Sequence, residues 1–282
     1  MKSNSRNITW LASYPKSGNT WFRVFLSNLL SLEIQPVSIN SLMDTPIASS
    51  RYLFDYYTGI SSAELKRYEI EYLLPKVFQQ ISAESVDNVY IKVHDAWRKN
   101  LRMDPIFPAR YTKAVVYIVR NPLDIAVSLS NHFSKPVEKC IADINDTKFE
   151  LCAKNFKLHT QLYQYVSSWS NHVDSWLFQS KLPIQIVKFE DMINKPYDTF
   201  SNIVSFLDLK YSKAEILDAI KLSSFEELKK QEESKGFKEK PIGSKYFFNR
   251  GEVGYWKEIL TENQSNVIID SNRLMMNALG YL

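Results

Sequence analysis

The sequence lacks any long hydrophobic run. Its longest uninterrupted apolar stretch, residues 114–119 (AVVYIV), is far shorter than the roughly 20 residues that a membrane-spanning helix needs. The first residues, MKSNSRN, are polar and lead directly into a strand-like segment, without the apolar core of a secretory signal. We therefore expect a soluble, cytoplasmic protein that has no membrane partner.

Cysteine is scarce, with two residues in a chain of 282. Cys140 and Cys152 lie twelve positions apart in a polar segment. We interpret them as free thiols of a reducing compartment, with a local disulfide as the alternative. Neither the cysteines nor the histidines have the spacing of metal ligands, so we expect no metal.

An excess of charge of one sign is also missing. The chain has 35 lysines and arginines against 31 acidic residues, a formal net charge of +4. This balance is too mild to argue for nucleic-acid binding, although a few cations focused in one cleft could still bind a small polyanion. The chain shows no internal repeat and no low-complexity tract, and its composition is that of a globular protein.

Short apolar strands that alternate with longer helical patterns are what the chain does contain. Buried strands are predicted over four segments: residues 8–14, 88–94, 114–119 and 184–189. Apolar spacing predicts a helix after the first strand, a helix that begins at Pro122, and helices over residues 155–180 and 262–279. This alternation favours an α/β fold, with a single domain over residues 1–282 and a central parallel sheet flanked by helices.

Three polar segments are candidates for contacts with a substrate. Residues 134–148 and 229–245 are predicted to be long loops that either gate a site or serve as solvated connections. Residues 40–57 hold a group of aromatic residues: Tyr52, Phe54, Tyr56 and Tyr57. These aromatic side chains favour a partly apolar ligand, with a core or interface role as the alternative.

The segment after the first strand has the character of an anion site. Residues 15–20, PKSGNT, join a strand to a helix, and the unpaired N–H groups of a helix N-terminus attract anions. Lys16 precedes the glycine, Gly18, whereas a Walker phosphate loop has its lysine after the last glycine. Taken alone, the segment is interpreted most simply as a strand-to-helix turn with a surface lysine.

Four further segments change that interpretation. Residues 14–21, YPKSGNTW, resemble the 5′-phosphosulfate loop of soluble sulfotransferases that use 3′-phosphoadenosine 5′-phosphosulfate (PAPS). The other resemblances follow in family order: YIKVHDAW at 90–97, YIVRNPLDIAVSLSNHF at 117–133, KLSSFEELKKQ at 221–231 and NRGEVGYWKEILT at 249–261. Five motifs in order, over about residues 10–261, indicate membership of this family far more strongly than one motif does. The resemblance also implies a P-loop-like strand–loop–helix at the phosphosulfate site.

The resemblance implies roles for particular residues. Lys16 and Lys92 would stabilise the transition state, and His94 would be the general base, because histidine titrates near neutral pH. Lys92 and His94 are two positions apart on a strand, so they face the same side. The implied cofactor-binding residues are Lys16, Ser17, Gly18, Asn19, Thr20, Trp21, Arg120, Ser128, Ser223, Phe225, Arg250 and Gly251. Trp21 has a place in the apolar core as its alternative.

Three positions depart from the family pattern. Asn249 stands where a second basic residue is usual, Tyr255 replaces an aspartate, and Phe189 replaces a tyrosine. All three bear on cofactor affinity and leave the residues assigned to chemistry in place. The remaining histidines receive no site role, because they lie on predicted helices: His132, His159 and His172.

The function that the resemblance implies is transfer of a sulfuryl group from PAPS to a small-molecule acceptor. The acceptor atom would be a hydroxyl oxygen in preference to an amine nitrogen, attacking sulfur in line while His94 takes its proton. Two rivals are a nucleotide-dependent phosphotransferase and a non-catalytic nucleotide-binding scaffold of the same fold. No nucleic-acid partner is expected, and a homodimer is left open.

Overall fold

A computed structural model of the protein describes residues 6–31, 33–42, 45–153, 159–241 and 243–282. The chain divides into two compact units. The first unit comprises Met1–Tyr14, Thr45–Tyr117 and Asp146–Gln185, and the second comprises Pro15–Asp44, Ile118–Asn145 and Ile186–Leu282. The number of domains therefore stays a prediction.

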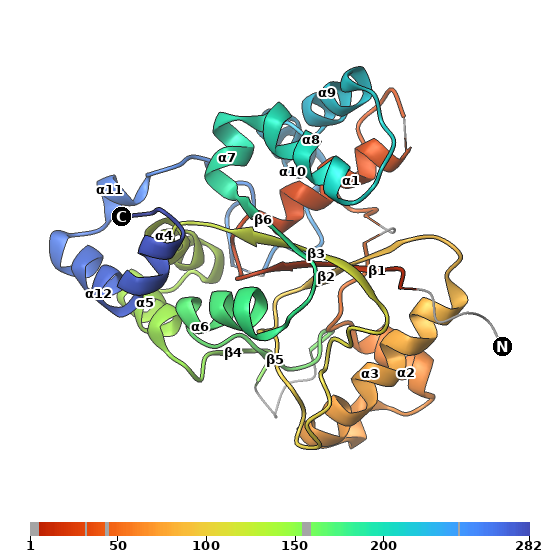
Figure 1. Ribbon diagram of the computed structural model, residues 1–282. Helices are drawn as coiled ribbons and strands as arrows, with labels where there is room; N and C mark the ends of the chain where they lie inside the picture. The colour runs from red at the N-terminus through yellow and green to blue at the C-terminus, as the bar shows by residue number, and fades with distance from the viewer. Residues whose placement is uncertain (1–5, 32, 43–44, 154–158, 242) are drawn as a thin grey trace. The chain divides into compact units, whose positions relative to one another are not determined.

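A four-stranded sheet contains all four predicted strands. Its order is β2-β1-β3-β6 (Figure 1), and its strands are β1 (Ile8–Ser13), β2 (Val89–Val93), β3 (Thr112–Val119) and β6 (Ile184–Lys188). β1 and β2 run parallel, with Ile8 opposite Val89 and Ala12 opposite Val93. Every residue of β1 is buried, as expected for a strand covered on both faces. The predicted α/β fold with a central parallel sheet is confirmed.

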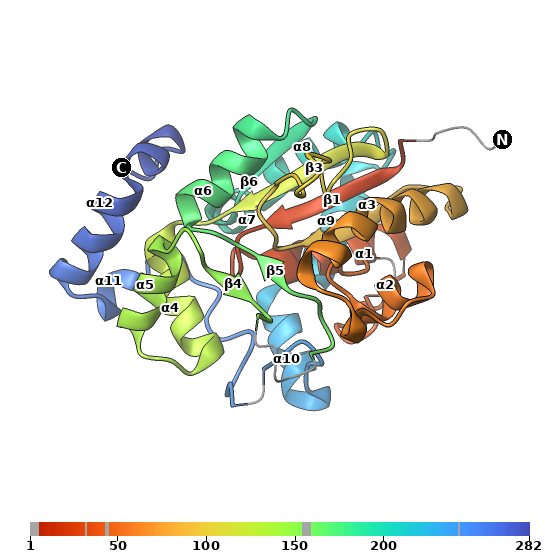
Figure 2. The same ribbon diagram turned by 90° about the horizontal axis from the view of Figure 1, so that it is seen from below.

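The first unit adds a small set of helices and a hairpin to the sheet. They are α2 (Arg51–Thr58), the 3₁₀-helix η1 (Ser62–Glu64), α3 (Arg67–Glu84), β4 (Glu150–Leu151), β5 (Gln164–Tyr165), α6 (Trp169–Asp174) and the π-helix η2 (Ser175–Gln179). Helices α2 and α3 lie side by side in both views (Figures 1 and 2). In the core, the Trp10 ring packs edge-on against Phe78 and Phe107, at centroid distances of 4.8 and 5.1 Å. The Trp10 indole N–H donates to the Thr112 hydroxyl (2.8 Å), so its polar atom is satisfied inside the core.

The second unit is mostly helical. Its helices are α1 (Asn19–Ser31), α4 (Pro122–Phe133), α5 (Val137–Asn145), α7 (Phe189–Asn194), α8 (Pro196–Phe206), α9 (Lys213–Leu222), α10 (Phe225–Lys235), α11 (Trp256–Ile259) and α12 (Glu262–Ala278). Helix α4 begins at Pro122, and α12 matches the predicted last helix to within one residue. The α4, α5 and α12 helices pack together (Figure 2). Phe25 of α1 stacks on Phe200 of α8 at 3.9 Å between ring centroids.

One predicted helix is wrong over residues 159–168. Helix was predicted over residues 155–180, of which 155–158 lie outside the described residues. The chain is extended around β5 and becomes helical at Trp169, where the Ser168 side chain accepts the Asn171 N–H as an N-cap. Pairing of β5 with β4, and the bond from the Val166 N–H to the Phe149 carbonyl (3.0 Å), outweigh the helical periodicity of this segment.

The segments predicted to be loops contain helices. Residues 134–148 include α5, in which Cys140 and Ile144 are fully buried. Residues 229–245 include the end of α10, and Phe237 is buried in a cluster with Leu228 and Phe248; residue 242 lies outside the described residues. Both segments carry apolar residues that the packing uses.

The aromatic residues of 40–57 have different surroundings. Phe54 is part of the core, whereas Tyr52 and Tyr56 are mostly exposed on α2; residues 43 and 44 lie outside the described residues. Phe54 therefore takes the core role that was its alternative. Across the described ranges, no helix combines the length and apolar character of a membrane span.

Candidate active site

The turn between β1 and α1 has the geometry of an anion-binding loop. Lys16 and Gly18 both have positive φ values, of +70° and +100°, in the left-handed region that disfavours most side chains. A Cβ atom at position 18 would lie 2.6 Å from the Phe189 ring, so the turn needs glycine for space as well as for conformation. The Ser17 hydroxyl is buried and has no hydrogen-bond partner among the described residues. An unpaired buried hydroxyl at a helix N-terminus is what a bound anion would satisfy.

Arg120 follows β3 directly and lies against the same loop. Its guanidinium donates to the Lys16 carbonyl (3.4 Å) and to the Glu252 carbonyl (3.0 Å), and its carbon lies 4.1 Å from the centre of the Phe189 ring. Nε of Arg120 is buried without a partner within the described residues. Burial lowers the pKa of Arg120, while the nearby carboxylates of Asp124 and Glu190 oppose that change. A phosphate would supply both the missing acceptor and a counter-charge.

The late motif forms a second glycine turn. Gly251 has a φ of +66°, and a Cβ atom there would lie 2.5 Å from the ring of Phe225, the first residue of α10. Arg250 is about half exposed, and its guanidinium carbon lies 4.1 Å from the centre of the Tyr255 ring. Tyr255, where the family has an aspartate, therefore supports Arg250 through a cation–π contact. Asn249 is exposed and adds no charge.

Asp124 ties the late motif to helix α4. Its carboxylate is buried and accepts the backbone N–H groups of Gly254 (2.9 Å) and Trp256 (3.1 Å). These bonds fix the segment that carries Arg250 and Gly251. The motif spacing did not predict this role; the sequence signal was an acidic residue in the first turn of a helix.

Trp21 packs against the aromatic core, and its role in cofactor binding stays a prediction. Its indole N–H donates to the Ser223 carbonyl (2.7 Å), and its half-buried ring packs edge-on against Phe189 and Phe200 at 5.8 and 6.3 Å. The Ser223 hydroxyl is buried and points to the carbonyls of the preceding turn, with Ala219 at 2.8 Å. Ser223 thus holds Trp21 through its backbone. Ser128 is half buried on α4, about two helical turns beyond Arg120.

His94 has the hydrogen-bonding pattern of a base. It follows β2, and its Nδ1 lies 2.9 Å from the Ser13 carbonyl oxygen, which can only accept. The Ser13 hydroxyl also lies 3.3 Å from Nδ1. The shorter contact with the carbonyl favours a proton on Nδ1, which makes Nε2 the basic nitrogen of the ring. Lys92, two positions earlier, is nearly buried, and its backbone pairs with Pro46 (2.8 Å) and Ala48 (2.9 Å). This strand pairing holds the K-x-H segment in place.

A buried histidine forms a hydrogen bond with the backbone of His94. His172 Nε2 donates to the His94 carbonyl (3.2 Å), while its Nδ1 accepts from the Tyr117 hydroxyl (2.7 Å). Burial lowers the pKa of His172 to about 3, so this imidazole is neutral at pH 7. His172, which was assigned no role from the sequence, is thus a structural partner of the candidate base.

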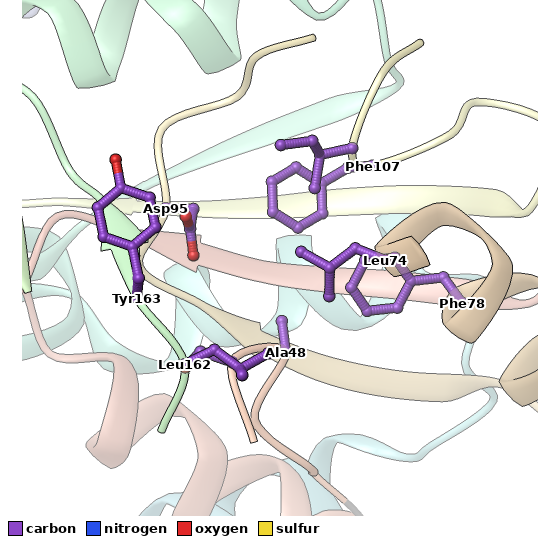
Figure 3. A pocket seen from close by; sticks show the side chains of 9 residues that line it. Ala48, Leu74, Phe78, Asp95, Phe107, Leu162 and Tyr163 are labelled. Atoms are coloured by element: carbon purple, nitrogen blue, oxygen red, sulfur yellow. The ribbon is translucent and has the colours of Figure 1, made fainter. Parts of the chain in front are cut away.

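A mostly apolar cavity lies beside the residue that follows His94. It is lined by Ala48, Ser49, Leu74, Phe78, Asp95, Ile106, Phe107, Leu162 and Tyr163. In Figure 3 the Asp95 carboxylate and the Tyr163 ring lie on one side, and the Leu74 and Phe107 side chains lie on the other. The Asp95 carboxylate accepts the Tyr165 N–H (3.0 Å) and lies 3.7 Å from Arg98. Burial nevertheless raises the pKa of Asp95 to about 6. The cavity presents one carboxyl group on a mostly apolar wall.

Comparison with known proteins identifies the family. The family model of the sulfotransferase domain matches residues 6–280. The chain belongs to the sulfotransferase family. It is 26% identical to cytosolic sulfotransferase 5 of Arabidopsis thaliana over 92% of this chain and 76% of that one. It is 25% identical to flavonol 3-sulfotransferase of Flaveria bidentis over 97% of this chain and 82% of that one. Sulfotransferase is the enzyme class that the five motifs predicted.

Solved structures of sulfotransferases share the fold. A mouse sulfotransferase complexed with 3′-phosphoadenosine 5′-phosphate (PAP) superposes with a TM-score of 0.60 at 18% identity, over 96% of this chain and 85% of that one. Retinol dehydratase in a complex with retinol and PAP gives a TM-score of 0.62 at 15% identity, over 96% and 82% of the two chains. At these identities the likeness concerns the fold.

The predicted site residues of this sulfotransferase divide between the two units. Lys92 and His94 belong to the first unit, and the predicted cofactor-binding residues belong to the second. The second unit brings together Lys16 with Arg120, Trp21 with Ser223, and Gly251 with Phe225. Three further residues contact this machinery without being predicted to do so: Asp124, His132 and His172. Asp124 and His172 bond to backbone groups, and His132 contacts a lysine side chain. The family motifs contain no residue pattern that marks such contacts.

Proposed function

We propose that this sulfotransferase moves a sulfuryl group from PAPS to an acceptor hydroxyl, in preference to an amine, by in-line displacement. The placement of His94 carries the proposal, because its Nδ1 lies 2.9 Å from the Ser13 carbonyl oxygen, a contact that fits the tautomer in which Nε2 is the basic nitrogen that would take the acceptor's proton. Lys16 and Lys92 would stabilise the charge that develops on the sulfuryl group and on the leaving phosphate. Most of the rate acceleration would come from positioning and electrostatics.

The second unit fits the nucleotide that this reaction requires. PAPS, when bound, supplies the activated sulfuryl group. Its 5′ end would be held by the loop residues Lys16, Ser17, Gly18, Asn19, Thr20 and Trp21, and its 3′-phosphate by Arg120, Ser128, Arg250 and Gly251. The unpaired Ser17 hydroxyl, the unpaired Arg120 Nε and the glycine turns at 18 and 251 support this assignment. Ser223 and Phe225 would lie on the adenine side. No metal is part of the proposal.

A small apolar molecule with a hydroxyl group is the proposed acceptor. One curated relative is a flavonol sulfotransferase, and one structural relative was solved with retinol. Flavonols and other phenols are therefore the first acceptors to test with labelled PAPS. A cytoplasmic location belongs to the proposal, since several relatives are named cytosolic.

The substitution His94→Ala tests the base. We expect turnover to fall by about 10² to 10⁴-fold, the usual contribution of general base catalysis, while the affinity for PAP measured by calorimetry stays unchanged. His159→Ala is the control, because His159 has no role in the proposed chemistry. Unchanged turnover in His94→Ala would show that another group takes the proton.

Two rival functions predict different results. A phosphotransferase would be stabilised by ATP–magnesium in a thermal shift experiment and not by PAP. A nucleotide-binding scaffold would be stabilised by PAP and would give no sulfated product with any acceptor. Stabilisation by PAP together with sulfate transfer excludes both.

A further inference from the structure

The ammonium group of Lys16 is held by two side chains from elsewhere in the second unit. Its Nζ lies 3.3 Å from His132 Nδ1 and 4.0 Å from the centre of the Phe247 ring. The rings of His132 and Phe247 also meet edge-on, at a centroid distance of 5.5 Å. A polar contact and an aromatic face therefore converge on one lysine ammonium.

Both partners of Lys16 are fixed by their own elements. His132 lies in the last turn of α4, the helix that carries Ser128 and follows Arg120. The Phe247 N–H donates to the carboxylate of Glu232 (2.7 Å), a buried residue of α10 that also accepts the Phe248 N–H (2.9 Å). His132 is therefore held by its helix, and Phe247 is held by the hydrogen bond to Glu232.

The chemistry of the contact fixes the state of His132. An ammonium group has three donors and no acceptor, so His132 Nδ1 has to be the lone-pair acceptor. The imidazole is then neutral, with its proton on Nε2. An unrestrained lysine side chain samples many rotamers, whereas this contact and the Phe247 face select a narrow range of ammonium positions.

We infer that His132 is a positioning residue that aims the Lys16 ammonium toward the transferring sulfuryl group, with Phe247 as the second wall. The inference rests on the role proposed for Lys16. His132 touches the lysine, and it acts on the reaction through that lysine. A catalytic group that is held in place before the substrate binds lowers the activation barrier of the transfer, because no conformational entropy has to be lost to order it during the reaction.

Two substitutions separate this role from simple packing. His132→Asn keeps an acceptor oxygen close to the position of Nδ1, whereas His132→Leu keeps an apolar side chain of similar bulk without an acceptor. If His132 positions Lys16, kcat falls about tenfold or more in His132→Leu and is largely retained in His132→Asn. If His132 only packs against Phe247, the order reverses, because leucine fills the apolar contact better than asparagine does.

The decisive measurement compares kcat, KM for PAPS and PAP affinity in the two variants, with His159→Leu as the matched control. The inference is supported by a loss in kcat in His132→Leu, with KM for PAPS and PAP affinity changed less than about twofold. It is overturned if His132→Leu keeps the wild-type kcat, or if His132→Asn is no better than His132→Leu.

The substitution Lys16→Met distinguishes a failure of the role inferred for His132 from a failure of the role proposed for Lys16. If Lys16→Met is inactive while His132→Leu is unaffected, only the positioning role of His132 is wrong. If Lys16→Met retains wild-type turnover, the role proposed for Lys16 is itself wrong, whatever the His132 variants show.

Discussion

At the scale of single residues, two glycines allow aromatic rings to pack closely against the turns that are proposed to bind the nucleotide. Gly18 lies against Phe189 and Gly251 against Phe225, and each combines a positive φ with a ring where a Cβ atom would be. Gly59 also has a positive φ, of +65°, but a Cβ atom there would meet nothing within 4 Å. The backbone conformation alone explains the glycine at position 59, whereas Gly18 and Gly251 are needed both for their conformation and for the space beside the ring.

We predict that Gly251→Ala is more harmful than Gly59→Ala. Both variants pay for the left-handed backbone, roughly 1 kcal/mol, and only Gly251→Ala also displaces Phe225, which adds about 1–3 kcal/mol. Urea unfolding gives the free energy of unfolding of each variant, and calorimetry gives its PAP affinity. Equal destabilisation by the two substitutions would show that Phe225 yields without cost.

At the scale of elements, helix α4 organises the proposed nucleotide site. Arg120 precedes it, and Asp124 in its first turn binds the backbone of residues 254–256. Ser128 lies in its middle, and His132 in its last turn contacts Lys16. One helix therefore connects the first loop with the late motif of the sequence.

Asp124→Asn should weaken PAP binding about tenfold. An asparagine has one acceptor oxygen where the carboxylate uses two, so one backbone N–H loses its partner and the turn with Arg250 loosens. Asp198→Asn is a matched control, because Asp198 occupies the same third position of a helix, α8, that also begins with proline, and its side chain is exposed. Calorimetry with PAP measures the difference; equal affinities for the two variants would contradict the role of Asp124.

At the scale of the whole molecule, two buried titratable groups of the first unit oppose each other as the pH falls. His172 has a pKa of about 3 in the folded protein against an ordinary value of 6.5, so below about pH 6.5 the unfolded chain binds a proton that the folded protein refuses. Stability from His172 is therefore lost on acidification. The pKa of Asp95 is raised from 3.8 to about 6, so the folded protein holds a proton that the unfolded chain has released between these values. Stability from Asp95 is gained on acidification over that range.

Replacing His172 should isolate one of these opposing effects. Between pH 7.5 and pH 5, wild type should lose about 2 kcal/mol more of its free energy of unfolding than His172→Gln does, since about 1.4 kcal/mol per pH unit is linked to one proton. Urea unfolding at both pH values measures this difference, with His159→Gln as the control. If wild type and His172→Gln lose stability equally, the pKa of His172 is the same in the folded and the unfolded protein and burial does not lower it.

Much of the fold and the family could be predicted from the chain itself. The four strands were recognisable because continuous apolar runs suit a sheet that is covered on both faces, and Pro122 marked the start of α4. The extended segment before Trp169 was missed because strand pairing with residues distant in sequence outweighed a local helical period. The helix α5 was missed because its apolar residues are few and are interrupted by charge.

The sequence by itself determined the family, the α/β class and the residues that resemble the sulfotransferase motifs, because these depend on residue type and spacing along the chain. The tertiary structure alone decided which atoms support those residues. The Ser13 carbonyl contacts His94 Nδ1, the Asp124 carboxylate holds the late glycine turn, and His132 contacts the Lys16 ammonium. These partners lie 81, 130 and 116 positions apart, and hydrogen bonds over such separations leave no periodicity in the sequence from which they could be read.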